Sequence, residues 1–201
     1  MREQKEIKQD DDHEIIVRCQ KGDVEAFEEI VNKYQKKMFN ISYRMLSDYN
    51  DASEVVQDAF VSVYKNIKSF KGRSRFFTWL YTIVVNLSRN RIKQVKTMAE
   101  REQFSIDEPI ETDDGQVKAE FASGDLSVLE KLEKRELEIK VQTCINALEH
   151  EFREVIVLRD LQGFAYEEIS DMLKIAAGTV KSRLHRARDA VKNCLKKVIE
   201  K

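Results

Sequence analysis

Apolar residues recur at spacings of three and four along most of this 201-residue chain, which contains one proline, Pro109, and six glycines. That spacing places apolar side chains on one face of an α-helix, whereas an all-β chain of this length needs many more turn residues. Hydrophobic residues make up 42% of the chain and charged residues 35%, so a core can form beneath a strongly charged surface. We therefore expect an all-α protein.

The periodic segments predict two small helical domains joined by a flexible acidic linker. In the first domain, residues 12–96, we expect helices at about 12–21, 23–46, 50–69 and 74–96, with Gly22 ending the first and Asp23 capping the second. Residues 97–126 lose the core-forming pattern, and nine acids lie between Glu100 and Asp125, so we interpret this segment as the linker. Helical periodicity resumes in the second domain, residues 127–201.

The formal net charge of −1 hides opposed blocks of charge. Residues 86–97 carry four cations and no acid, and residues 174–201 carry nine cations and two acids, on either side of the acidic linker. Each block keeps its own local field, so a basic block is either a nucleic-acid contact or plain solvated surface.

Cysteines and apolar runs limit the other classes of function. The three cysteines lie far apart and fit no metal spacing, and we expect Cys144 and Cys194, on apolar stripes, to be buried free thiols. No signal-like segment or membrane-spanning run occurs, so we expect a cytoplasmic protein without membrane insertion. No cluster of residues suggests a nucleophile, a metal site or a phosphate loop, so we expect no cofactor and no enzymatic activity.

The segment from Tyr166 to Ala190 predicts a helix-turn-helix. YEEISDML, residues 166–173, forms a short helix, residues 174–177 make a tight connection, and a second helix begins near Gly178. Its inward stripe is Val180, Leu184, Ala187 and Val191. The opposite face is polar with cationic shoulders, which suits the DNA major groove, although a solvated amphipathic helix is the alternative. The candidates for base contacts are Lys181, Ser182, His185 and Arg186, and those for phosphate contacts are Arg183 and Arg188.

The third expected helix carries acids at helical spacing beside apolar residues, with no cation from Tyr49 to Tyr64. This stripe either suits a basic helical partner or is solvated surface. The acids are Asp48, Asp51, Glu54 and Asp58.

The fourth expected helix combines a core stripe with a face suited to nucleic acid. The core stripe is Phe76, Leu80, Ile83 and Leu87. The adjacent face is aromatic, then amide, then cationic: Trp79, Thr82, Asn86, Arg89, Asn90 and Lys93. Just upstream lie Phe70, Lys71, Arg73 and Arg75. Aromatic rings stack on unpaired bases, amides read base edges and cations hold phosphates. Trp79 fits either this face or the core.

Together these segments resemble the extracytoplasmic-function (ECF) members of the sigma-70 family, which are bacterial promoter-recognition subunits. The resemblance covers nearly the whole chain outside the linker and termini, and is carried by KGDVEAFEEIVNKY, DASEVVQDAF, FKGRSRFFTWLYTIVVN, and FREVIVLRDLQGFAYEEI followed by GTVKSRLHRAR. It implies an initiation factor whose partners are core RNA polymerase, through its clamp helices and flap, promoter DNA and an anti-sigma factor.

The resemblance also implies a division of labour by position. The first domain would open and read the minus-10 element, with Phe70 holding a flipped base, Asn86 contacting a base and Trp79 near the melted strand. Lys181, Ser182, His185 and Arg186 would read the minus-35 element. Contacts to the polymerase clamp would come from Asp51, Glu54, Gln57 and Asp58. The acidic linker resembles the connector that threads polymerase channels, and we expect its charge to mimic RNA there.

Four residues depart from the family's pattern without touching the groove face: Glu149, Ala165, Lys174 and Ala176. They weaken helix-start and turn signals, and the missing serine cap at position 165 is worth roughly 0.5–2 kcal/mol.

Two other functions stay open. A helix-turn-helix regulator outside the polymerase would need neither the acidic helix nor the aromatic loop, and a sigma-mimicking adaptor would bind protein without starting transcription.

Overall fold

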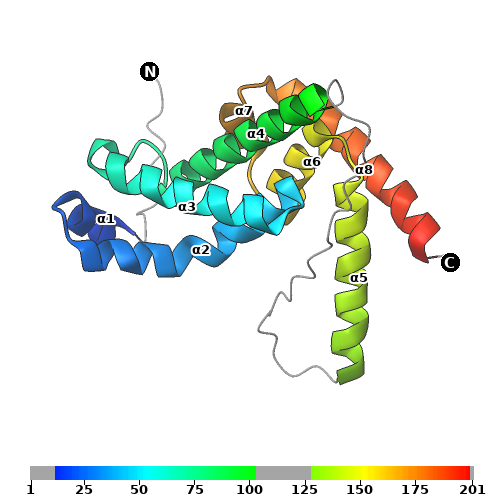
Figure 1. Cartoon of the computed structure of the whole chain (residues 1–201), viewed down its shortest axis with the longest axis horizontal. Coiled ribbons are helices and arrows are strands. Elements are labelled where there is room, and N and C mark those ends of the chain that lie inside the picture. Colours follow the sequence, from blue (N-terminus) through cyan, green and yellow to red (C-terminus); the bar gives the residue numbers. More distant parts are fainter. Residues whose placement is uncertain (1–11, 103–127, 200–201) are drawn as a thin grey trace, which may run out of the picture. The chain divides into compact units, whose positions relative to one another are not determined.

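The computed structural model describes residues 12–102 and 128–199, and every element in these ranges is helical, as the periodicity predicts (Figure 1). The chain divides into two compact units, Met1–Ser105 and Ile106–Lys201, here called the N-terminal unit and the C-terminal unit. Residues 103–127, which hold most of the predicted linker, lie outside the described ranges.

The N-terminal unit contains α1 (His13–Gln20), α2 (Val24–Leu46), α3 (Tyr49–Asn66), the 3-10 turn η1 (Ile67–Ser69) and α4 (Phe76–Glu102). Helices α2, α3 and α4 pack against one another, and α1 packs on α2. Gly22 ends the first helix with a φ of +94°, a backbone conformation that glycine adopts without strain. The Asp23 carboxylate then accepts a bond of 3.0 Å from the Ala26 N–H, which confirms the predicted cap.

The buried face of α4 differs from the expected stripe. Phe76 and Leu80 are buried as predicted, but Ile83 and Leu87 are only half-buried, so that expectation was wrong for these two. Because α4 packs against both α2 and α3, its buried face is wide, and it also includes Tyr81, Val84, Val85 and Ser88. Ser88 is polar, so a search for apolar residues at helical spacing does not include it in the buried face. Its hydroxyl lies 3.3 Å from the hydroxyl of Ser42.

Helix α4 runs six residues further than predicted, to Glu102, so residues 97–102 are helical rather than linker. The side chains from Lys93 to Ala99 are exposed, so no core requires this extension. The sequence TMAERE contains alanine, glutamate, arginine and methionine, which favour helix even without burial. The loss of apolar residues at helical spacing therefore marks where α4 stops packing against the other helices, and the helix itself continues to Glu102.

The C-terminal unit contains α5 (Val128–Asn146), α6 (His150–Ile156), the π-helical turn η2 (Val157–Leu161), α7 (Tyr166–Leu173) and α8 (Ala177–Ile199). Helix α8 packs against α5, α6 and α7. The π turn continues α6 to the expected break, where the Gln162 N–H bonds to the Val157 carbonyl at 3.1 Å and Gly163 has a φ of +77°.

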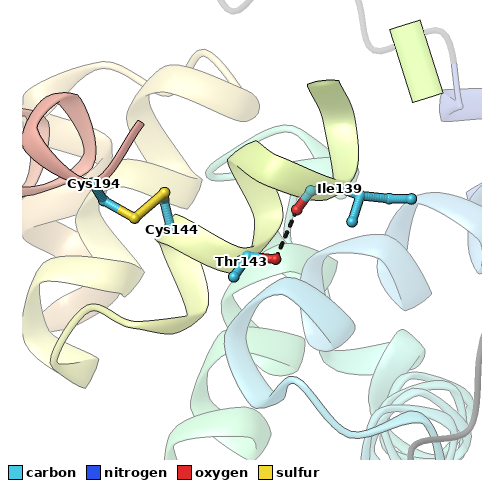
Figure 2. Close-up of a disulfide and its surroundings, with 4 residues drawn as sticks. All are labelled: Ile139, Thr143, Cys144 and Cys194. Carbon is cyan, nitrogen blue, oxygen red and sulfur yellow. Dashed lines mark hydrogen bonds between the residues drawn. A yellow bond between two sulfur atoms is a disulfide. The ribbon is translucent and has the colours of Figure 1, made fainter. Parts of the chain in front are cut away.

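Cys144 of α5 and Cys194 of α8 form a disulfide, with their Cα atoms 5.7 Å apart (Figure 2). The expectation of two free thiols was therefore wrong. Both cysteines do lie on apolar stripes, but they are 50 residues apart, and only the packing of α5 on α8 brings them together. Cys19, in the N-terminal unit, is a buried free thiol, and its burial raises the pKa of the thiol.

Candidate functional site

The helix-turn-helix is formed by α7, the turn at residues 174–176 and α8. Lys174 ends α7 in the left-handed conformation, with a φ of 57°, and its N–H bonds to the Ser170 carbonyl. The Ser170 hydroxyl donates a bond of 2.5 Å to the Ile175 carbonyl and so braces the turn. Apolar side chains of the two helices are buried against each other: Ile169, Met172, Leu173, Val180, Leu184 and Ala187. The turn therefore fixes the direction in which α8 leaves α7.

The start of α8 presents an exposed polar face, and all four predicted base-contact residues lie on it: Lys181, Ser182, His185 and Arg186. His185 Nε2 lies 3.4 Å from the Asp189 carboxylate, one turn further along, and both side chains are largely exposed. The Ser182 hydroxyl donates to the Thr179 carbonyl at 3.0 Å, which leaves its oxygen as an acceptor. Four cationic or hydrogen-bonding side chains of different length are thus available to one ligand.

The two predicted phosphate-contact residues have different surroundings. The Arg183 guanidinium bonds to Glu151 at 2.5 Å and lies 3.6 Å from the buried Glu154. The Arg188 guanidinium bonds to both oxygens of Asp160, at 2.9 and 2.5 Å, and this carboxylate holds the pKa of Arg188 above its ordinary value. These arginines tie α8 to α6 and to the π turn. Sequence spacing could not reveal their acidic partners, which lie 28 and 32 residues away.

The loop before α4 and the start of α4 bring three aromatic rings together. Phe70 lies 5.0 Å from Trp79 and 5.7 Å from Phe76, measured between ring centroids. Phe76 is buried, as expected, whereas Phe70 and Trp79 are half-buried, so each keeps part of its ring accessible. Gly72, with a φ of +65°, turns the chain between them.

Cations and amides surround this aromatic cluster along the chain. Lys71, Arg73 and Arg75 are exposed in the loop, and Asn86, Asn90 and Lys93 are exposed at helical spacing along α4. Arg89 is half-buried at the edge of that row. The order from aromatic ring through amide to cation, expected from the sequence, is therefore present on accessible surface.

Gln20, at the end of α1, holds the loop in place and was missed by the sequence reading. Its side-chain amide donates to the carbonyls of Ile67, at 3.0 Å, and Phe70, at 2.9 Å. A single glutamine gives no sequence signal for such a contact, because its partners lie 47 and 50 residues further along.

Two acids of the stripe on α3 form ion pairs with an arginine whose role the sequence did not reveal. Arg91 of α4 bonds to Asp51 at 2.5 Å and lies 3.2 Å from Glu54. Asp51 raises the pKa of Arg91 above its ordinary value. Asp51 is half-buried in this network, whereas Glu54, Gln57 and Asp58 are exposed. Among the four predicted clamp contacts, the exposed residues therefore begin at Glu54, one turn after Asp51.

An apolar groove of about 490 Å³ runs between α2 and α3 beside this stripe. Phe27 and Tyr64 meet edge to face across it, with ring centroids 5.0 Å apart. Val61 is 45% exposed and Tyr64 is 54% exposed, although both are large and apolar. The residues that line the groove are Phe27, Val31, Gln35, Ser53, Val56, Gln57, Phe60, Val61 and Tyr64.

The C-terminal unit has its own groove, of about 560 Å³, between α5, the π turn and the second half of α8. Its walls are almost entirely apolar, and Lys192 and Lys196 lie at its rim with the Arg188–Asp160 pair. Exposed apolar surface with a cationic edge suits an amphipathic segment that carries acids. We call this feature the C-terminal groove.

Within residues 12–102 and 128–199, no group of histidine, cysteine or acidic side chains has the arrangement of a metal site. None of the helices in those same ranges is long and apolar enough to cross a membrane.

Comparison with known proteins identifies both units. The family description Sigma-70 region 2 matches residues 30–97, and Sigma-70, region 4 matches residues 138–191. The chain is 33% identical over 199 residues to the RNA polymerase sigma-H factor of Pseudomonas aeruginosa, which covers 96% of this chain and 98% of that relative. It is also 33% identical over 182 residues to the ECF RNA polymerase sigma factor SigW of Bacillus subtilis, covering 90% of this chain and 95% of SigW.

Solved structures agree with this assignment. The sigma factor RpoE from Bartonella quintana, solved with the anti-sigma factor NepR, matches with a TM-score of 0.63 and 25% identity, over 85% of this chain and 96% of RpoE. CnrH, solved with the cytosolic domain of CnrY, has the same fold with a TM-score of 0.61 and 20% identity, over 92% of this chain and 97% of CnrH. The order of the two matched regions, the relatives and the fold all agree: the chain belongs to the sigma-70 family, in its extracytoplasmic-function group.

Proposed function

We propose that this sigma factor directs core RNA polymerase to its promoters by dividing recognition between its two units. The observation that carries the proposal is the exposed face of Lys181, Ser182, His185 and Arg186 on the second helix of a helix-turn-helix. The major groove admits one helix, and it distinguishes base pairs through donors and acceptors that such side chains match. This face would read the minus-35 element.

Arg183 and Arg188 serve first to orient the minus-35 helix. Their guanidinium groups are engaged by Glu151 and Asp160, so neither is as available to a phosphate as Lys181. Arg188 keeps 51% of its side chain exposed, and it can meet DNA at the edge of the groove while staying bonded to Asp160. The salt-sensitive part of the affinity for DNA then comes mainly from the exposed cations of the same face, Lys181 and Arg186.

The N-terminal unit would open and read the minus-10 element. Half-buried rings at Phe70 and Trp79 offer faces on which an unstacked base can lie, and Asn86 can bond to a base edge. Backbone phosphates would be held by Lys71, Arg73, Arg75, Arg89, Asn90 and Lys93. Gln20 would keep the loop at Phe70 in place for this task.

Polymerase would be bound at both units. The α2–α3 groove, with the exposed Gln57 and Asp58 beside the Arg91–Asp51–Glu54 network, would take the clamp helices. The C-terminal groove would take the flap through an amphipathic segment, because its lining is apolar and its rim is cationic. The rest of the predicted acidic linker, residues 103–126, would lie in polymerase channels as a connector.

The same surfaces would be covered by an anti-sigma factor when the protein is inactive. The similar RpoE of Bartonella quintana was solved with such a factor, which supports an equivalent partner for this chain. We place this activity in the cytoplasm, and we assign the chain no cofactor and no catalytic chemistry of its own.

The test is reconstitution of the purified chain with core RNA polymerase on a library of promoters. We expect a stable complex and initiation from a defined subset of promoters. A chain that binds DNA alone and never binds polymerase would be a regulator outside the polymerase. A chain that binds polymerase without initiation would be an adaptor.

A further inference from the structure

The Cys144–Cys194 disulfide joins two helix segments that pack on each other with few buried side chains. Among the described side chains of α5, only Cys144 and Ile145 are buried. On α8, no described side chain beyond Ala187 is buried, and Cys194 itself is half-buried. The end of α8 therefore depends on this bond for its position against α5, because burial is what otherwise holds a helix in place.

The same two segments form the walls of the C-terminal groove. Val141 and Ile145 line it from α5, three residues before and one residue after Cys144. Val191 and Leu195 line it from α8, at the same offsets from Cys194. The disulfide thus joins the two walls at positions next to the residues that line the groove, and it limits their spacing.

The recognition half of α8 is held independently of the disulfide. Val180, Leu184 and Ala187 are buried, and the Arg183 and Arg188 ion pairs join this half to α6 and the π turn. Breaking the disulfide would therefore loosen the groove wall while leaving the DNA-reading face in place.

We propose that Cys144 and Cys194 form a thiol–disulfide switch that gates the C-terminal groove. In the oxidised form the disulfide holds the walls at a fixed spacing, and the groove is ready for its ligand. In the reduced form the end of α8 moves away from α5, and binding must first order it, which lowers affinity. This inference rests on the proposed function, since it takes the groove's ligand to be an apolar, acid-bearing segment of polymerase.

The reductant is a low-molecular-weight thiol of the glutathione class. Its thiolate attacks the more accessible sulfur, that of Cys194, and the sulfur–sulfur bond breaks, so that Cys144 leaves as a thiolate and takes up a proton. A second thiol then attacks the mixed disulfide and releases the Cys194 thiol. In total, two small thiols lose two electrons and become one disulfide, and the protein gains two thiols. Oxidation by the small-molecule disulfide is the reverse.

A permanent disulfide between Cys144 and Cys194 would be unexpected in the cytoplasm, the compartment proposed for this protein. Thiol systems keep cytoplasmic cysteines reduced, and disulfides found there are mostly transient and redox-sensing. Cys19 does not compete for exchange, because it is buried in the other unit and burial raises the pKa of its thiol.

The affinity of the full chain for core RNA polymerase, measured after oxidation with glutathione disulfide and after reduction with dithiothreitol, tests the switch. We expect reduction to weaken binding by about fivefold or more, a typical size for coupling between sites. Cys19→Ala should keep this response. The double variant Cys144→Ala/Cys194→Ala should bind like the reduced protein in both buffers. Equal affinity of the two wild-type forms, or an unchanged redox response in the double variant, would overturn the proposal.

Two measurements on the wild-type chain without polymerase test the proposed switch even if the variants fold poorly. Amide hydrogen exchange at residues 193–199 should speed up on reduction, while residues 179–187 keep their protection. Thiol trapping across glutathione buffers should find the pair converting within the range of the cytoplasmic couple. If the cysteine pair stays oxidised throughout that range, the disulfide is a permanent structural bond, and the proposed switch is wrong. Failure of both redox forms to bind polymerase would instead contradict the proposed function.

Discussion

Arg183, Arg186 and Arg188 lie within two turns of α8, yet each has a different environment. Arg186 is exposed on the polar face, Arg183 is held by Glu151 beside the buried Glu154, and Arg188 is clamped by Asp160. Helical spacing predicted which of them flank the apolar stripe. It could not predict their acidic partners, because those come from α6 and the π turn through the tertiary fold.

Arg183→Ala should lower the free energy of unfolding of the C-terminal unit by about 1–3 kcal/mol. The change removes a hydrogen bond to Glu151 and a cation beside Glu154, whose side chain is 1% exposed. Lys181→Ala, an equally drastic change on the exposed face, should alter it by no more than about 0.5 kcal/mol. Urea unfolding of the two variants makes the comparison, and equal losses would mean that the ion pair does not stabilise the unit.

Gln20→Met should impair promoter opening, because it keeps the length of the side chain and removes both bonds to the Phe70 loop. Each such bond contributes roughly 0.5–1.5 kcal/mol, so we expect about a three- to tenfold loss of open complex. Permanganate reactivity of melted thymines at the minus-10 element measures this. Polymerase affinity serves as the control and should not change; normal melting would show that the loop holds its position without Gln20.

At the scale of elements, the sequence predicted most helices because their apolar spacing and caps are local. The caps at Gly22 and Asp23 and the buried stripe of Val180, Leu184 and Ala187 are examples. The failures arose where tertiary packing decides, or where intrinsic propensity extends a helix beyond its packed part. The π turn, the helical residues 97–102 and the Cys144–Cys194 bond leave no periodic signal.

Lys174→Gly should stabilise the C-terminal unit by about 0.5–1 kcal/mol, since Lys174 ends α7 in a left-handed conformation that glycine adopts more easily. The matched control is Lys192→Gly, in the exposed interior of α8, which should destabilise the unit by about 1 kcal/mol. Thermal unfolding compares the two. A loss of stability in both variants would mean that the Lys174 side chain itself supports the turn.

At the scale of the whole molecule, the sequence also predicted the two candidate DNA faces, since charged and aromatic residues at helical spacing are visible without a structure. It did not predict that Glu151 and Asp160 would engage Arg183 and Arg188, or that Arg91 would engage Asp51. The central claim concerns the pair of faces: the minus-35 face on α8 and the minus-10 face on the Phe70 loop and α4 would act on different promoter elements within one initiation complex.

The most direct test is transcription from a promoter library randomised at both elements, using the reconstituted holoenzyme and two variants. Arg186→Ala should relax base preference at the minus-35 element alone, with a loss of about 1–3 kcal/mol in discrimination at the contacted position. Asn86→Ala should relax preference at the minus-10 element alone and leave polymerase affinity unchanged. Relaxation of both elements by either variant, or of neither element by both variants, would contradict the division of promoter recognition between the two units.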